Sequence, residues 1–449
     1  MALFDTVVRR ACIAGERGPG ARTQRLVDIG ITGGRIAAVV TAPLPDGAGR
    51  AEIQAAGRLL LPGLVDSHIH LDKSRLGDRC QAGGPLASAM DEVRRAKAGF
   101  TPEDVYARGR ETLEACIVHG TTRLRTHVEV DPVVGLRGLD GVRALAADYA
   151  WAVEVQLCVF AQDGLTNVDG AIDLLARALA TGASVVGGAP YADVDPFAQI
   201  DAVFALARTY DVDVDLHLDL AEHTDAMTVD YVCDRTDELG LGGRVAVGHV
   251  TQLALVEAPR LRAVARRLAD AGVGVTVLPS TDLYLMGRAQ DHAAVRGVVP
   301  FSALDDAGVV SSVATNNVLN PFTPYGDCSL VRMTNLYANL CHVARPADRA
   351  ACLDMVSYGA ATLMRLPDYG IEVGLPADLV CFDAGAPDDA VAEVAEARWG
   401  MRRGRMTFER PAARLLGPST GRPAGAGRRA PRTAAPSVGS EPWAHRTDR

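Results

Sequence analysis

Short apolar runs alternate with amphipathic stretches along most of this chain. A repeat of strand and helix predicts a parallel sheet, because parallel strands are buried on both faces and need long crossover connections. The predicted strands cover residues 64–71, 123–130, 153–160, 184–189, 212–218, 244–250, 273–278 and 309–314, and helical spacing is clear over 102–119, 168–181, 196–210, 224–239 and 257–271. Eight such units over roughly 250 to 300 residues have the length of a (β/α)8 barrel.

We therefore predict an α/β fold with a TIM-like barrel over residues 61–362. A doubly wound open sheet is the alternative. Its nucleotide-binding fingerprint is absent, because Gly272-x-Gly274 begins a strand instead of following one, and the chain has no Gly-Lys-Ser/Thr motif.

The chain ends have a different texture, with short strands and glycine-rich turns. We predict a small β-sandwich domain built from both ends, residues 1–60 and 363–410. Residues 411–449 are rich in Pro, Gly, Ala, Ser and Arg without periodicity, which predicts a disordered tail.

Composition narrows the class of partner. The chain has 449 residues, 48% of them hydrophobic and 22% charged, and a formal net charge of −9, which argues against a nucleic-acid binder and favours a small-molecule partner.

The nine cysteines are scattered and never form a Cys-x-x-Cys pair, so we expect reduced thiols. With no signal-like N-terminus and no apolar run approaching the ~20 residues of a membrane span, we expect a cytoplasmic protein without a membrane contact. The sequence leaves a homo-oligomer open.

Polar residues recur where the predicted strands end. In a parallel barrel, catalytic groups lie at the C-terminal ends of the strands. These positions carry His68 and His70 on the first strand, His127 on the second, Gln162 after the third, His217 and Asp219 on the fifth, His249 on the sixth, and Asn316 and Asn317 on the eighth.

Histidines from separate strands can converge on one divalent metal ion, zinc or iron, and a water on such a metal has a pKa of about 7. A two-metal site bridged by a carboxylated lysine needs a lysine near the fourth strand. The chain has only Lys73 and Lys97, so we expect a single metal. Asp72 and Lys73 are interpreted as a local ion pair or as lining of the pocket mouth.

The chain resembles the amidohydrolase superfamily, and within it the cytosine deaminase and N-isopropylammelide hydrolase-like branch. The similarity runs from about residue 3 to about residue 405. The motifs that carry it are Pro62-Gly63-x-x-Asp66-x-His68-Ile69-His70-Leu71-Asp72, Arg125-Thr126-His127-Val128, Phe160-Ala161-Gln162-Asp163-Gly164, His217-Leu218-Asp219, Gly248-His249-Val250-Thr251, Leu285-Met286-Gly287-Arg288 and Asn317-Val318-x-Asn320-Pro321-Phe322.

The resemblance implies that His68, His70 and His217 hold the metal, that Gln162 binds an amide-like edge of the substrate, and that His249 faces the substrate and the attacking water. We expect Asn317 and Asn320 to add hydrogen bonds to a substrate ring.

Two positions depart from the pattern that the resemblance implies. Asn316 stands where the family has an aspartate that ligates the metal and accepts a proton, and Leu220 stands where the deaminases have a glutamate that moves protons. Asn316 can still ligate through its oxygen. The proton transfer has moved to Asp219, Glu222 or His249, or the leaving group needs little protonation, or the protein binds without turnover. Glu222 is equally well interpreted as an acid at a helix N-terminus.

We therefore expect a metal-dependent hydrolase of non-peptide C–N bonds in small cyclic amides or amidines. The alternative is a non-hydrolytic small-molecule binder, or a degenerate enzyme on the same scaffold.

Overall fold

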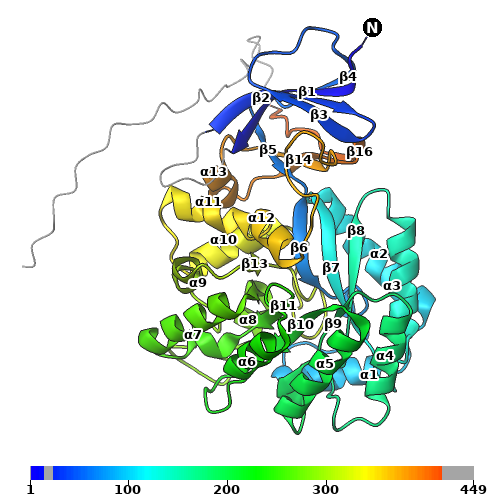
Figure 1. Ribbon diagram of the computed structural model, residues 1–449, viewed down its shortest axis with the longest axis vertical. Helices are drawn as coiled ribbons and strands as arrows, with labels where there is room; N and C mark the ends of the chain where they lie inside the picture. The colour runs from blue at the N-terminus through cyan, green and yellow to red at the C-terminus, as the bar shows by residue number, and fades with distance from the viewer. Residues whose placement is uncertain (1, 15–23, 417–449) are drawn as a thin grey trace, which may run out of the picture. The chain divides into compact units, whose positions relative to one another are not determined.

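Eight parallel strands form the barrel of this computed structural model, which describes residues 2–14 and 24–416 (Figure 1). Neighbouring strands follow one another in sequence order. The strands are β6 (Leu64–Ile69), β7 (Thr121–Glu129), β8 (Glu154–Phe160), β9 (Val185–Val186), β10 (Asp213–Leu218), β11 (Val245–His249), β12 (Val273–Val277) and β13 (Ser311–Val313). Each overlaps one of the eight predicted runs, so the predicted α/β fold with a TIM-like barrel is confirmed.

The barrel closes between its first and last strands. Ile69 and Asn316 form a parallel β-bridge. The Asn316 N–H donates to the His68 carbonyl at 2.8 Å, and the His70 N–H donates to the Asn316 carbonyl at 3.1 Å. The closure therefore holds the backbone of Asn316 between the two histidines that end the first strand.

Strand β9 is shorter than its predicted run because a glycine follows it. A Cβ atom on Gly187 would lie 2.2 Å from the carbonyl oxygen of Asp215 on β10. Only glycine allows this close approach of the two backbones. The Gly187 N–H still donates to the Val159 carbonyl of β8 at 2.9 Å, so the chain stays attached to the barrel.

Helices connect the strands and surround the barrel (Figure 1). Local caps explain where several begin: Thr101 accepts a hydrogen bond from the Asp104 N–H before α2, and Asp195 does the same for the Ala198 N–H before α5. The α-helices are α1 (Leu86–Lys97), α2 (Pro102–Val118), α3 (Arg137–Asp148), α4 (Ala171–Ala180), α5 (Pro196–Tyr210), α6 (Val229–Leu239), α7 (Ala258–Ala271), α8 (Pro279–Leu285), α9 (Phe301–Ala307), α10 (Leu330–Leu340), α11 (Pro346–Asp354), α12 (Tyr358–Leu363) and α13 (Pro387–Ala392), and the short 3-10 helices are η1 (Pro190–Ala192) and η2 (Thr251–Ala254).

Helix α6 begins later than the sequence pattern predicts, at Val229 instead of residue 224. The Asp219 carboxylate accepts hydrogen bonds from the Thr228 N–H at 2.9 Å and the Val229 N–H at 3.1 Å. It therefore satisfies backbone donors that the first turn of a helix leaves unpaired.

Strands from both chain ends join a second sheet, as predicted. Hydrogen bonds connect β1 (Phe4–Ala14), β2 (Gln24–Thr32), β3 (Arg35–Val40), β4 (Gly49–Gln54), β5 (Leu59–Pro62), β14 (Leu379–Phe382), β15 (Ala397–Arg402) and β16 (Arg405–Glu409). Arg123 at the start of β7 pairs with Asp378 before β14 at 3.0 Å, which ties this sheet to the barrel.

Most of the predicted tail, residues 417–449, lies outside the described residues. Within the part of the chain that is described, no helix combines the length and the hydropathy needed to cross a bilayer.

Candidate functional site

Three histidine side chains meet at the C-terminal end of the barrel. His68 and His70 come from β6 and the residue directly after it, and His217 comes from β10. Nε2 of His217 lies 3.1 Å from Nε2 of His68 and 3.2 Å from Nε2 of His70, and all three side chains are buried. Nitrogen ligands about 2.1 Å from one tetrahedral zinc ion lie about 3.4 Å apart. The spacing therefore fits a shared metal ion.

The proton states of these histidines also suit a metal. Nδ1 of His70 lies 3.0 Å from the His127 carbonyl oxygen, so Nδ1 carries the proton and Nε2 keeps its lone pair. Burial, together with the neighbouring imidazoles, holds the pKa values of His68 and His217 well below the ordinary value. Neutral imidazole is the form that ligates a metal.

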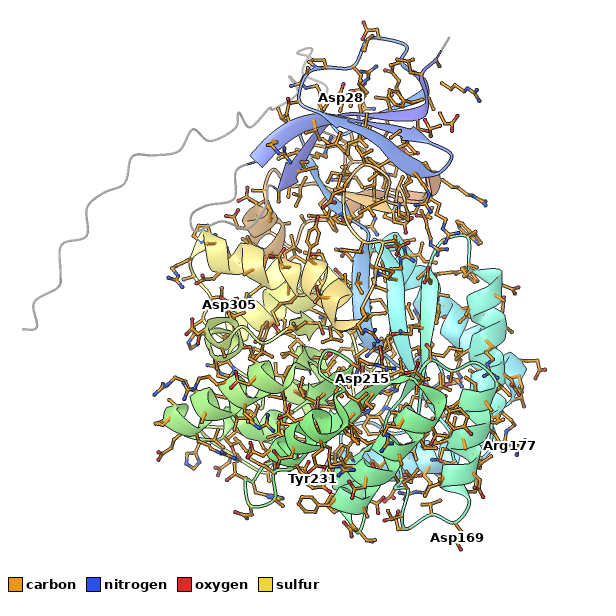
Figure 2. All side chains as sticks on the ribbon, in the orientation of Figure 1. Asp28, Asp169, Arg177, Asp215, Tyr231 and Asp305 are labelled. Carbon is orange, nitrogen blue, oxygen red and sulfur yellow. The ribbon has the colours of Figure 1, made fainter. Side chains whose placement is uncertain are left out.

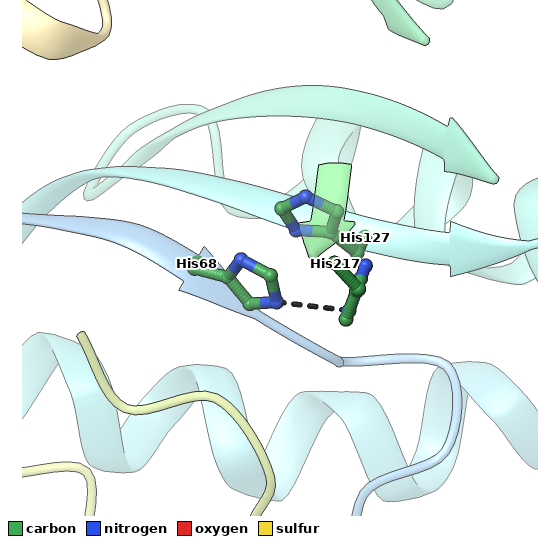
Figure 3. A group of neighbouring side chains, drawn as sticks. All are labelled: His68, His127 and His217. Atoms are coloured by element: carbon green, nitrogen blue, oxygen red, sulfur yellow. Dashed lines mark hydrogen bonds between the residues drawn. The ribbon is translucent and has the colours of Figure 1, made fainter. Parts of the chain in front are cut away.

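A fourth histidine, His127 of β7, lies behind this group. Its ring stacks on that of His68 with centroids 3.7 Å apart, and donor atoms of His68, His127 and His217 all lie within 4.8 Å of one another (Figure 3). However, Nε2 of His127 lies 3.4 Å from Oδ1 of Asp215, which is labelled in Figure 2. Because its ring is directed at this carboxylate, His127 supports His68 and, through its carbonyl, His70.

The backbone hydrogen bonds that close the barrel place Asn316 next to His68 and His70. Its side-chain oxygen accepts a hydrogen bond from Nδ2 of Asn317 at 3.0 Å, and its own Nδ2 is buried without a hydrogen-bond partner in the described chain. The oxygen that metal ligation would need is thus already engaged by Asn317.

Asn320 has a different role from the predicted one. Its Nδ2 donates to the Lys73 carbonyl at 3.1 Å and to Oδ1 of Asn317 at 2.7 Å. Its Oδ1 accepts from the backbone N–H groups of Phe322 and Thr323. An amide offers two donors and two acceptor positions, and all four are occupied. The expectation that Asn320 binds substrate is therefore corrected: it shapes the loop after β13, and it also occupies the oxygen of Asn317.

Gln162 lies in a buried polar group with a lysine. Its Oε1 accepts from Nζ of Lys73 at 3.0 Å, and its Nε2 donates to the Tyr191 hydroxyl at 3.1 Å. Since an ammonium group only donates, Lys73 fixes which way the amide points. Lys73 also lies 3.7 Å from Glu129. Burial raises the pKa of Asp72, and the charge of Lys73 opposes that effect.

His249 at the end of β11 is paired with a carboxylate that the sequence pattern did not single out. Nδ1 of His249 lies 2.5 Å from Oδ1 of Asp282 in α8, and the two side chains are 3% and 0% exposed. Burial raises the pKa of Asp282, and the nearby His249 opposes that effect. Asp282 follows the seventh strand by five residues, and inspection of the segment after that strand would have found it.

The other two predicted catalytic groups are bound elsewhere. Asp219 caps α6 and also accepts from the Thr228 hydroxyl at 2.7 Å. The Glu222 carboxylate accepts from the Gly287 N–H at 2.9 Å, and it is not at a helix N-terminus, because α6 begins seven residues later. In the described chain neither carboxylate hydrogen-bonds to a histidine of the site.

Four non-glycine residues at these strand ends, among others elsewhere in the chain, have a left-handed backbone conformation. Asp219, His249, Val250 and Asn316 adopt φ values of 48°, 70°, 43° and 60°. Non-glycine residues rarely occupy this left-handed region, and β-branched Val250 is the least suited to it. Such strain persists only where surrounding structure enforces it, and it clusters at functional sites.

A second buried charge group lies next to Lys73. Lys97, the last residue of α1, pairs with Glu129, Asp131 and Asp163. Burial by itself lowers the pKa of Lys97, but the three carboxylates outweigh it and raise that pKa above its ordinary value. Three acids within metal-ligand reach of one another thus already share a protein cation. The only two lysines of the chain both lie at this end of the barrel.

The sequence profile described as the Amidohydrolase family matches residues 145–408. Among curated proteins, the chain is similar to the pterin deaminase of Rhizobium rhizogenes, with 28% identity over 414 residues, 90% of this chain and 93% of that protein.

Two solved structures share the fold over almost the whole barrel and small sheet. One is 5-methylcytosine deaminase from Klebsiella pneumoniae liganded with 5-fluorocytosine, at 25% identity, a TM-score of 0.85, and coverage of 91% of this chain and 98% of that chain. The other is N-isopropylammelide isopropylaminohydrolase from Burkholderia multivorans, at 30% identity, a TM-score of 0.77, and coverage of 90% and 98%. These relatives are hydrolytic enzymes that act on C–N bonds, and the chain belongs to the amidohydrolase family.

Proposed function

We propose that this protein is a metal-dependent hydrolase that removes an amino or alkylamino group from a small nitrogen heterocycle. The observation that carries the proposal is the meeting of three neutral, buried imidazoles next to the Lys73–Gln162 pair. The names of the similar proteins add support, because they describe pterin, 5-methylcytosine and N-isopropylammelide as compounds acted on.

One divalent metal ion, zinc or iron, would be held by His68, His70 and His217. The fit rests on the 3.1 and 3.2 Å nitrogen separations and on the lone pair that Nε2 of His70 keeps, because Nδ1 of that ring donates to the His127 carbonyl. Asn316 would add its side-chain oxygen as a fourth ligand, because an amide oxygen has two acceptor positions and the hydrogen bond from Asn317 uses one of them. When bound, the metal supplies Lewis-acid activation of water for attack on an electrophilic carbon.

The ring would be bound through donors of the chain. Gln162 keeps one N–H and Lys73 keeps ammonium protons beyond those used in their mutual contact, and such donors suit a carbonyl oxygen or an unprotonated ring nitrogen. Because the amide orientation is fixed, this edge favours acceptor groups over donor groups. A cyclic amide or amidine, such as an oxo-substituted pyrimidine, triazine or pteridine ring, presents that pattern.

His249 would accept and return the proton that hydrolysis moves. Asp219 and Glu222 are weaker candidates. The Asp219 carboxylate already accepts three hydrogen bonds from Thr228 and Val229, and the Glu222 carboxylate accepts one from Gly287.

A panel of cytosine, 5-methylcytosine, N-isopropylammelide and pterin tests the proposal. We expect the protein reconstituted with zinc or with iron to release ammonia or isopropylamine from at least one of them. His217→Ala is the matched control, and it should bind less metal and release no amine. The proposal is wrong if the protein carries one metal per chain and hydrolyses no ring compound of this panel or of a wider set of cyclic amidines.

A non-hydrolytic binder is the second candidate, favoured by Asn316 and Leu220, neither of which can carry a proton. Binding of a panel compound without amine release, measured by calorimetry on the metal-loaded protein, would favour this candidate.

A further inference from the structure

The groups able to hold a proton near the histidines are few. Leu220 is buried and apolar, and the amide of Asn316 does not titrate in the working range. Asp215 is engaged by Arg125 at 2.6 Å, and Asp219 caps α6. Asp282 remains, and among the described residues its carboxylate has a side-chain hydrogen bond only with His249.

We propose that Asp282 is a positioning residue that fixes the tautomer and orientation of His249, and that this pair carries out the proton transfer that Leu220 and Asn316 cannot provide. The proposal rests on the proposed hydrolytic function. Asp282 does not touch the substrate; it acts through the imidazole.

Geometry determines which nitrogen of His249 is free. Nδ1 lies 2.5 Å from Oδ1 of Asp282, and a carboxylate can only accept at this distance unless it is protonated. The proton therefore resides on Nδ1, and Nε2 keeps a lone pair. The second oxygen of Asp282 is buried without a hydrogen-bond partner within the described chain.

The position of the ring is set by the barrel. His249 pairs with Leu218 in the ladder between β10 and β11, and the Val250 N–H donates to the Leu218 carbonyl at 2.9 Å. The left-handed backbone at His249 and Val250 turns the chain directly after this pairing. The imidazole centroid consequently lies 5.6 Å from that of His217 and 6.1 Å from that of His68, beside the proposed metal ligands and separate from them.

A single imidazole can then accept and return the one proton that the reaction transfers. As water forms the new C–O bond, one of its protons passes to Nε2 of His249. The imidazolium, stabilised by the Asp282 carboxylate, returns that proton to the amine nitrogen as the C–N bond breaks. Water and the amino-substituted ring give the oxo-substituted ring and the free amine, and the His249–Asp282 pair ends with the proton count with which it began.

The tautomer of His249 can be read without turnover. We would label the protein with 15N-histidine, assign the His249 signals by their loss in His249→Gln, and record long-range proton–nitrogen spectra of the metal-free and the zinc-loaded protein. The expected result is a protonated Nδ1 and an unprotonated Nε2 at His249. A protonated Nε2 in the parent protein overturns the proposal, even if no Asp282 variant folds.

Kinetics provide the second measurement, using whichever panel compound is turned over. Asp282→Asn should lower kcat by about 10²- to 10⁴-fold, the usual loss when general acid–base catalysis is impaired, with KM changed less than about threefold. It should also shift the His249 proton away from Nδ1. The proposal is overturned if kcat falls less than about threefold.

Asp28→Asn is the matched control, because Asp28 is also a buried aspartate but lies in the small sheet, where it accepts from Arg9 at 2.9 Å. It should lower stability while leaving kcat and the His249 spectrum unchanged. If no compound is hydrolysed and Nδ1 of His249 is still protonated through Asp282, the pairing stands and the proposed function fails.

Discussion

Replacement of Lys97 by methionine should destabilise the fold strongly. The Lys97 side chain is 1% exposed, and its ammonium group contacts Glu129, Asp131 and Asp163. Methionine is also long and unbranched but carries no charge. The substitution therefore removes the cation from among three buried or nearly buried carboxylates with little change in packing.

The size of the stability loss depends on which partners the three carboxylates keep after Lys97 is removed. Glu129 keeps Lys73 at 3.7 Å, and Asp163 keeps Arg94 at 2.9 Å. Oδ2 of Asp131 loses the hydrogen bond that Lys97 provides, and although its Oδ1 still accepts from the Val133 and Val134 N–H groups, this buried carboxylate loses its cation. Breaking a buried ion pair by removing one partner costs about 3–5 kcal/mol, and we expect the free energy of unfolding at neutral pH to fall by that amount.

The loss should depend on pH with a definite sign. In the parent, the folded-state pKa of Lys97 is raised, so its contribution to stability is fully present below the unfolded value near 10.5 and is lost only at higher pH. Burial raises the pKa of Glu129 and Lys97 opposes that effect, so in Lys97→Met the folded-state pKa of Glu129 rises further above its unfolded value. The variant should therefore lose more stability at about pH 8 than at about pH 5.5.

Urea unfolding at both pH values measures the difference, and hydrogen exchange over α1 shows whether the helix loses protection. Lys97→Met combined with Asp131→Asn should regain much of the loss, because the orphaned charge is removed. Arg95→Met, which breaks an exposed pair with Glu92 on the same helix, should cost under about 1 kcal/mol. Stability of Lys97→Met within about 1 kcal/mol of the parent at both pH values would refute the reasoning.

Three further outcomes are expected. In His217→Ala, the metal content measured by elemental analysis should fall well below that of the parent. A chelator should lower the Tm of the parent but not of the variant. Equal metal content in the two proteins would contradict the assignment of His217 as a ligand. Lys73→Met should raise KM by about tenfold or more with a smaller change in kcat, because the substrate loses a charge-assisted hydrogen bond of about 1.5–3 kcal/mol. An unchanged KM would count against substrate binding by Lys73. Burial alone would raise the pKa of Asp193, but hydrogen bonds from Thr166, Leu165 and Gln199 lower it to about 2. The parent should therefore lose stability as the pH falls from about 4 through about 2. Urea unfolding of Asp193→Asn should not show this pH dependence.

Much of the barrel could be predicted because its signals are local. An apolar run such as residues 244–250 is bounded by polar helices on both sides, and its length and composition indicate a buried strand without reference to the rest of the chain. The structure confirms the eight predicted strands and their order around the barrel. The start of α6 was placed too early, because Asp219 caps Thr228 and Val229 across a turn that periodicity does not reveal.

The site could be predicted only as far as strand ends could be located. The histidines were located at one face because residues at the C-terminal ends of parallel strands share it, and the family resemblance implied that His68, His70 and His217 are the three that hold the metal. Asn320 was expected to hydrogen-bond the substrate ring together with Asn317, and in the structure all four hydrogen-bonding positions of its amide are occupied by the chain.

The partners of the charged groups were decided by tertiary structure. Asp282 meets His249 across 33 residues of sequence, and Lys73 meets Gln162 across 89. Sequence by itself determined the barrel, the small sheet and the histidines at one end, because hydrophobic periodicity and strand polarity act over short distances. Only the closed barrel determined which carboxylate faces which imidazole or lysine, because those contacts depend on the relative rotation and register of strands that are far apart in the chain.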